Sequence, residues 1–128
     1  MEISVVSKKR NEMIDITDRV GDLVKDIKEG TVVLYVPHTT AGITINEGAD
    51  PTVQADILRK LGELVPVDDG YNHTEGNSDS HIKASLIGSS VQVIAENGKL
   101  QLGTWQSVFF CEFDGPRKRK VLCSFSTI

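Results

Sequence analysis

The sequence SSVQVIAENGKLQLGT, residues 89–104, contains the clearest β-hairpin signal of the chain. The pair Asn97-Gly98 supplies the positive φ angles of a type I′ turn, and apolar or β-branched residues flank it on both sides. We therefore predict strands at residues 89–95 and 99–104. Because two strands joined by so short a turn run in opposite directions, the sheet that contains them is expected to be antiparallel.

Further strands are predicted by short apolar and β-branched runs elsewhere in the chain. They lie at residues 3–6, 31–36, 42–45, 105–113 and 121–125. The run TVVLYV at 31–36 is continuously apolar or β-branched, which is typical of a strand covered on both faces, and Pro37 ends it.

Apolar residues at helical spacing predict helices between these strands. They span residues 17–30, 50–64 and 80–88. Thr17 or Asp18 would cap the first helix. Asp50 could enter a cleft, but a capping role is favoured because Pro51 follows it directly in the first turn. The expected fold is therefore α+β, with a mostly antiparallel sheet or sheets and a few helices.

Length and composition indicate one compact domain over residues 1–128, with 39% hydrophobic and 25% charged residues. No apolar run approaches the roughly 20 residues of a membrane-spanning helix, and the N-terminus lacks the basic-then-apolar order of a signal peptide. We therefore expect a soluble cytoplasmic protein without a membrane partner. The formal net charge of −4 argues against general affinity for nucleic acid. Cys111 and Cys123 lie in apolar stretches and are predicted to be buried free thiols.

All three histidines of the chain lie in polar, turn-like segments. His38 follows the strand at 31–36, His73 lies in the polar segment 65–79, and His81 lies in the first turn of the third helix. Neutral imidazole binds zinc and related metals well, and three histidines with one open position would form a catalytic metal site. We therefore predict a divalent metal, zinc or another transition metal rather than magnesium, which prefers oxygen ligands. The alternative is that these histidines are unrelated surface or capping residues.

Several carboxylates accompany the histidines. The segment 65–79 is long for a small domain, which favours a functional role. Glu75 and Asp79 lie in or at the end of this segment, and Glu47 follows the strand at 42–45. We predict that these carboxylates act as a further metal ligand or as a catalytic base.

Four other residues are candidates for binding a phosphorylated small molecule. Asn46 could enter the same cleft as Glu47. Backbone amides around Asn77, at the start of a helix, could hold an anion with Lys83 adding charge, or these residues could form a simple capped turn. The basic run at 117–120 either binds phosphate, which the planar guanidinium of arginine grips well, or forms a solvated hairpin turn. Arg117 is the member that we assign to the site.

Five separated segments of the chain resemble, in order, the YjbQ-like protein family. They are LYVPHTTAG at 34–42, NE at 46–47 with DP at 50–51, His73 with EGN at 75–77, DSHIKAS at 79–85, and LGTWQ at 102–106 with CEFDGPR at 111–117. Because the likeness covers nearly the whole chain, it is far more specific than one short pattern. The candidate histidines all lie within these segments.

The resemblance implies a compact α+β fold, a homotrimer and the activity of a secondary thiamine-phosphate synthase. That transferase joins hydroxymethylpyrimidine diphosphate to thiazole phosphate and releases pyrophosphate. Fold and family alone do not fix function, so two alternatives stay open. One is a metal-dependent phosphoester hydrolase, which fits the histidines naturally. The other is a non-catalytic protein that binds a metal or a phosphorylated metabolite.

Overall fold

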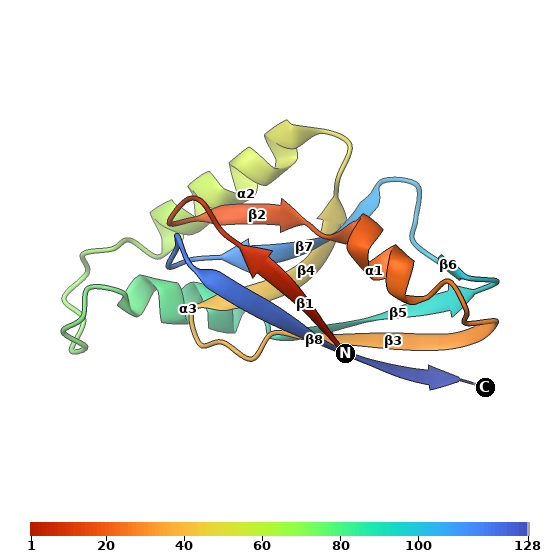
Figure 1. Ribbon diagram of the computed structural model, residues 1–128. Coiled ribbons are helices and arrows are strands. Elements are labelled where there is room, and N and C mark those ends of the chain that lie inside the picture. Colours follow the sequence, from red (N-terminus) through yellow and green to blue (C-terminus); the bar gives the residue numbers. More distant parts are fainter. Residues whose placement is uncertain (128) are drawn as a thin grey trace.

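The computed structural model describes residues 1–127 and confirms the α+β class (Figure 1). The strands are β1 (Glu2–Val6), β2 (Glu12–Asp15), β3 (Glu29–Tyr35), β4 (Ala41–Glu47), β5 (Ser90–Glu96), β6 (Lys99–Leu100), β7 (Gln106–Glu112) and β8 (Lys118–Thr127). The helices are α1 (Thr17–Leu23), α2 (Pro51–Leu64) and α3 (Ser78–Ile87).

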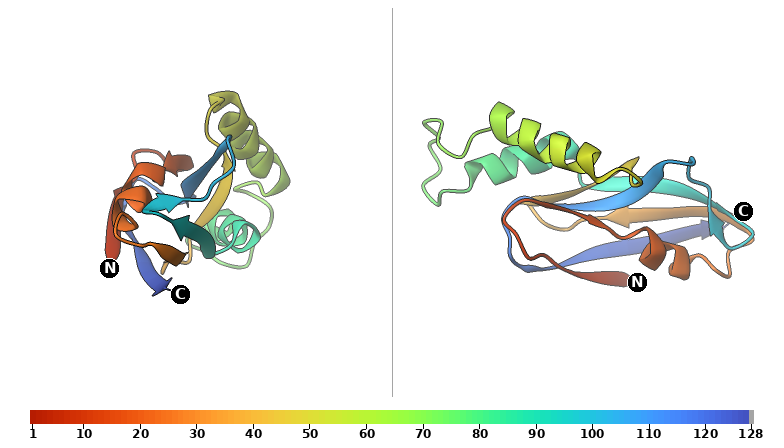
Figure 2. Two further views of the ribbon diagram at one scale, coloured as in Figure 1. Left: turned by 90° about the vertical axis from the view of Figure 1, so that its right-hand side faces the viewer. Right: turned by 90° about the horizontal axis from the view of Figure 1, so that it is seen from above.

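The strands form two antiparallel sheets that pack face to face (Figure 2). The order is β1-β8-β3-β5-β6 in the five-stranded sheet and β2-β7-β4 in the three-stranded sheet. Helices α2 and α3 cover the outer face of the three-stranded sheet, so the molecule has three layers. The predicted hairpin is present as β5 and β6, with Asn97 and Gly98 both at positive φ, but its second strand ends at Leu100 and does not reach Thr104 as predicted.

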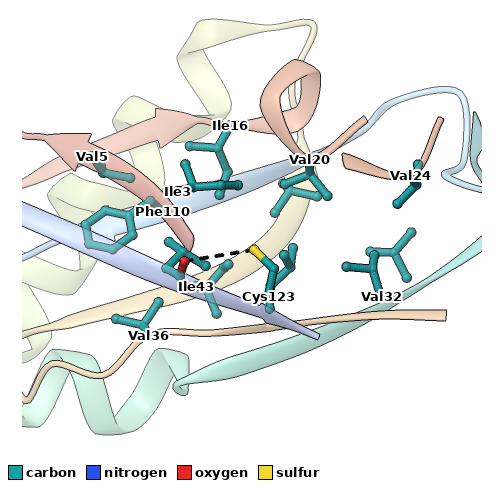
Figure 3. Close-up of a cluster of buried hydrophobic side chains, with 14 of the residues drawn as sticks. Ile3, Val5, Ile16, Val20, Val24, Val32, Val36, Ile43, Phe110 and Cys123 are labelled. Atoms are coloured by element: carbon teal, nitrogen blue, oxygen red, sulfur yellow. Dashed lines mark hydrogen bonds between the residues drawn. The ribbon is translucent and has the colours of Figure 1, made fainter. Parts of the chain in front are cut away.

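The alternation of side chains along β7 explains how this strand supports two hydrophobic clusters. Val108 and Phe110 belong to the core between the two sheets. Figure 3 shows Phe110 within this cluster. Phe109 and Cys111 point the other way and pack beneath α2 and α3. Because successive side chains of a strand face opposite sides, one central strand holds all three layers together.

Three further differences from the sequence-based prediction concern the first helix, β2 and β3, and the burial of side chains explains the first. The first helix ends at Leu23 instead of Gly30, yet Val24 and Ile27 are buried as the apolar spacing requires. These two side chains reach the core from the segment that follows the helix. The apolar spacing therefore predicted correctly which residues are buried, but the helix does not extend to them. Neither Thr17 nor Asp18 is the cap, because the N-cap residue is Ile16. The second difference is β2, which was not predicted.

The third difference concerns β3, which is covered on one face only. Val32 and Leu34 are fully buried against the other sheet, whereas Tyr35 on the opposite face is 46% exposed. The prediction that both faces are covered is therefore wrong for a single chain.

The prediction for α2 is confirmed, because the Asp50 side chain accepts a hydrogen bond from the Thr52 backbone amide and Pro51 lies in the first turn.

Both cysteines are buried and free, as predicted, and burial raises the pKa of Cys111 to about 12. Within residues 1–127, none of the helices has the length and apolar character that crossing a membrane requires.

Candidate functional site

A polar pocket lies where two strand connections meet the beginning of α3, at the left of Figure 1. The β3–β4 connection supplies one wall, the β7–β8 connection a second, and the loop before α3 a third. The pocket has a volume of about 380 Å³. Its lining residues are Pro37, His38, Thr39, Thr40, Glu75, Asn77, His81, Asp114, Arg117 and Arg119.

Arg119 on β8 lines the pocket and forms a buried ion pair with Glu112 on β7, which lies behind it and is not a lining residue. The Arg119 Nε atom lies 2.9 Å from Glu112 Oε1, and Nη2 lies 2.5 Å from Oε2. Glu112 also accepts hydrogen bonds from the Ser7 hydroxyl at 2.7 Å and from the backbone amide of Asp114 at 3.0 Å. Burial raises the pKa of Glu112, but these hydrogen bonds outweigh burial, and the pKa lies below its usual range.

A second ion pair forms the rim. Arg117 donates to the Asp114 carboxylate at 2.9 Å and to the Asp114 carbonyl at 2.8 Å. Asn77 at the start of α3 donates to the same carboxylate at 3.0 Å, which ties α3 to the β7–β8 connection. Arg117 is half exposed, so it lies at the pocket as predicted but in a more open position than Arg119.

His38 is held through one ring nitrogen, because its Nε2 accepts a hydrogen bond from the Lys120 backbone amide at 3.0 Å. Burial and the neighbouring Arg119 lower the pKa of His38, which favours the neutral ring. In a neutral ring that accepts at Nε2, the proton is on Nδ1. His38 is therefore a neutral hydrogen-bond donor at this pocket.

The three histidines do not converge within one chain. His38 and His81 line the same pocket, whereas His73 lies outside it, with its ring 5.5 Å from that of His81. His73 Nε2 lies 3.1 Å from the Asn77 side-chain oxygen. In residues 1–127, no three histidine, cysteine, aspartate or glutamate side chains are placed to hold one metal ion. The predicted three-histidine site is therefore not formed by this chain alone, and a divalent metal stays a prediction.

Asp79 and Lys83 are buried and paired with each other, and they lie away from the pocket lining that they were expected to join. The Asp79 carboxylate accepts two hydrogen bonds from Arg10, both at 2.9 Å, and one from Lys83 at 3.0 Å. Burial raises the pKa of Asp79, but the two cations outweigh burial and lower it to about 2. Neither side chain lines the pocket, and together they fasten α3 to the segment before β2. We therefore assign them a structural role.

Asn46 and Glu47 lie at the opposite end of β4 from the pocket (Figure 1). The strand enters the pocket region near Ala41, which pairs with Glu112, and Glu47 pairs with Gln106 at its far end. The Glu47 carboxylate accepts from the Ala49 amide at 2.9 Å, which stabilises the turn toward α2. The prediction that these two side chains enter the same cleft as the histidines is therefore wrong within one chain.

Sequence reasoning did not single out Thr40 and Arg119, which line the pocket, or Glu112, which pairs with Arg119. Arg119 belongs to the basic run for which phosphate binding and a solvated turn were both left open, and only Arg117 was taken into the site; β8 begins at Lys118, and alternation turns Arg119 inward. The signal was present in the sequence: Arg119 and Val121 are two residues apart, so they share a face of the strand.

Comparison with known proteins agrees with this fold. The model of the family described as "UPF0047 protein YjbQ-like" matches residues 1–127. The chain is 52% identical to a UPF0047 protein of Methanocaldococcus jannaschii, over 91% of this chain and 86% of that protein. It is 51% identical to the UPF0047 protein YugU of Bacillus subtilis, over 91% of each.

Solved structures are similar over the whole chain. An uncharacterised protein of the YjbQ/UPF0047 family from Clostridium acetobutylicum has a TM-score of 0.96 and 52% identity, with 98% of this chain and 99% of that chain covered. A conserved hypothetical protein from Thermus thermophilus has a TM-score of 0.94 and 42% identity, with the same coverage. With the family model and these relatives in agreement, the chain belongs to the UPF0047 family of YjbQ-like proteins.

Proposed function

We propose that the pocket binds a phosphorylated small molecule and promotes the departure of its phosphate-bearing group. The observation that supports this proposal is the joint lining of one polar pocket by Arg117, Arg119 and two histidines. Guanidinium groups recognise phosphate oxygens through planar, charge-assisted hydrogen bonds. The favoured reaction is the transfer implied by the family resemblance, of the thiamine-phosphate synthase type.

In this reaction the bond between the methylene carbon on the pyrimidine ring and the diphosphate oxygen breaks, and pyrophosphate leaves with the bonding electron pair. The lone pair of the thiazole nitrogen forms the new carbon–nitrogen bond. Arg117 and Arg119 would stabilise the charge that develops on the leaving group, and the Nδ1 proton of His38 would donate a hydrogen bond to it. Glu75, an exposed carboxylate of the lining, would position the nucleophile.

The residues of one chain do not fit a metal cofactor. His38 Nε2 is engaged by a backbone amide, and His73 lies outside the pocket. Within the described residues the donors needed for one ion do not come together. We therefore derive no step of the reaction through a metal.

The test is an assay of the pure protein with hydroxymethylpyrimidine diphosphate and thiazole phosphate, run with magnesium, with zinc and with chelator. Formation of thiamine phosphate, lost in an Arg117→Ala, His38→Ala double variant that remains folded, is the expected result. Lys60→Ala on the exposed side of α2 is the matched control. Release of inorganic phosphate without thiamine phosphate would favour a phosphoester hydrolase instead. Binding of both compounds without turnover would leave a binding protein.

A further inference from the structure

In the guanidinium group of Arg119, the Nε and Nη2 atoms are held by hydrogen bonds, whereas the Nη1 atom is not. An arginine side chain carries five N–H donors. Its Nε and Nη2 atoms donate to Glu112, and Nη2 also donates to the Thr40 hydroxyl at 2.8 Å. The two N–H groups of Nη1 have no hydrogen-bond acceptor among residues 1–127.

The free nitrogen must face the pocket. Arg119 as a residue is only 8% exposed, but no buried side-chain nitrogen or oxygen of the described residues lacks a hydrogen-bond partner. Nη1 is therefore accessible to solvent. Because Arg119 is only 8% exposed and lines the pocket, we assign this access to the pocket. A donor pair that is held in one orientation by the rest of its guanidinium group, with no acceptor of its own, is suited to receive the oxygen of an anion.

We infer that Nη1 of Arg119 is the primary phosphate-binding group of this pocket. This inference rests on the proposed function, because it names the group that holds the phosphate there. Glu112 positions Arg119 without competing for Nη1, and this fixed geometry saves the entropy that a mobile side chain loses on binding. Arg117, exposed at the rim, is the secondary contact.

The pocket differs from a general basic patch in its charge balance. Glu112 neutralises Arg119 and Asp114 neutralises Arg117, so the two pairs add no net charge to the pocket. Phosphate selection therefore depends on directed N–H groups. An exposed lysine of the same strand, such as Lys118, cannot replace them.

The experiment follows the guanidinium signals of the wild-type chain by ¹⁵N NMR during titration with inorganic phosphate. The Nη1 signal of Arg119 should shift saturably. Calorimetry should show that Arg119→Lys binds phosphate at least about tenfold more weakly than the wild type does. Lys118→Ala should change binding by less than about twofold. Because the Arg119→Lys variant could be destabilised, circular dichroism checks its fold, and the wild-type titration stands independently of it.

Absence of phosphate binding, or binding without any shift at Arg119, would overturn the inference. The two proposals can be told apart. Thiamine phosphate formation with an unresponsive Arg119 would retain the proposed function and reject this residue. A saturable Arg119 shift with phosphate, without thiamine phosphate formation or binding, would retain Arg119 and reject the substrate.

Discussion

Two groups of buried charged side chains, one around Asp79 and one around Glu112, have different roles. Asp79 binds two cations, Arg10 and Lys83, and its carboxylate has no access to the pocket. Glu112 binds one cation, Arg119, whose remaining nitrogen reaches the pocket. In both cases burial is offset by hydrogen bonds, but only the second group leaves a donor for a ligand.

The pKa of Asp79 gives a prediction for acid stability. A carboxylate with a pKa of about 2 in the folded state and an ordinary value near 3.8 when unfolded stabilises the fold above pH 4. That contribution, about 2 kcal/mol, is lost as the pH falls from about 4 to about 2. NMR titration of the Asp79 side-chain carbon should give a midpoint near 2 in the wild type.

Arg10→Gln should raise this midpoint, because one of the two cations is removed while Lys83 keeps the carboxylate ionised. Lys25→Gln, which is exposed in the turn after α1, is the matched control and should leave it unchanged. A midpoint near 4 in the wild type would contradict the assignment.

The partners of the candidate residues could not have been predicted from sequence alone. Asp79 and Lys83 look catalytic because polar residues at a helix start suit a site, and nothing local reveals that Arg10 neutralises the carboxylate. The presence of Arg117, His38 and His81 at one pocket was easier to predict, because each of them lies at an end of a regular element. The Arg119–Glu112 pair depends on how the two sheets pack on each other, because β8 and β7 belong to different sheets, and the sequence does not specify that packing.

At the element scale, the β7–β8 connection is the segment on which the pocket depends. Gly115 lies so close to the N-terminal segment that an added Cβ atom would meet the Lys9 carbonyl and would lie 2.6 Å from the Ser7 hydroxyl. The close approach of this connection to Lys9 and Ser7 therefore requires glycine at position 115.

Gly115→Ala should therefore disturb the pocket and the stability together. We expect a loss of about 1–3 kcal/mol in the free energy of unfolding, measured with urea, and weaker phosphate binding. Gly62→Ala in α2 is the matched control, because an added Cβ atom there meets nothing within 4 Å. That control should be stabilising, since alanine favours a helix. Equal stability of the wild type and Gly115→Ala would show that the segment yields without cost.

Helix α2 gives a second prediction at this scale. It has no fully buried residue and packs through partly buried side chains such as Leu58 and Leu61, so its own cap matters more than for a buried helix. Asp50→Ala should increase hydrogen exchange of the first-turn amides of α2, while β7 amides stay protected. Asp56→Ala, exposed in the same helix, is the control. Unchanged exchange in Asp50→Ala would show that packing alone holds the helix start.

The elements themselves were largely predictable, for reasons that also explain the failures. Strands with buried alternate residues, such as β5, and the capped helix α2 carry strong local signals. Strand β2 has four residues, none of them fully buried, so its apolar signal is weak. Helix α1 ends early although its apolar spacing continues, because a turn can satisfy the same burial pattern.

In the molecule as a whole, the outer face of the five-stranded sheet exposes several large apolar side chains among polar ones. Helices cover the other sheet, but not this face (Figure 2). Val6, Tyr35 and Ile94 are 62%, 46% and 56% exposed, and Leu122 lies beside Tyr35 in the register between β3 and β8. The apolar run of β3 predicted a strand with two covered faces, and only one is covered within the chain.

We propose that other copies of the chain cover this face in a homotrimer, the assembly that the family resemblance implies. In a closed ring of three subunits each contact joins two different surfaces, so a change on one face affects every contact. The double variant Tyr35→Glu, Ile94→Lys should therefore be monomeric at 14.0 kDa, whereas the wild type should have three times that mass by light scattering. Leu64→Lys, equally apolar and exposed but on α2, is the control and should stay trimeric. A wild-type mass of one chain, or an unchanged mass in the double variant, would show that the partners of this face are not copies of the chain.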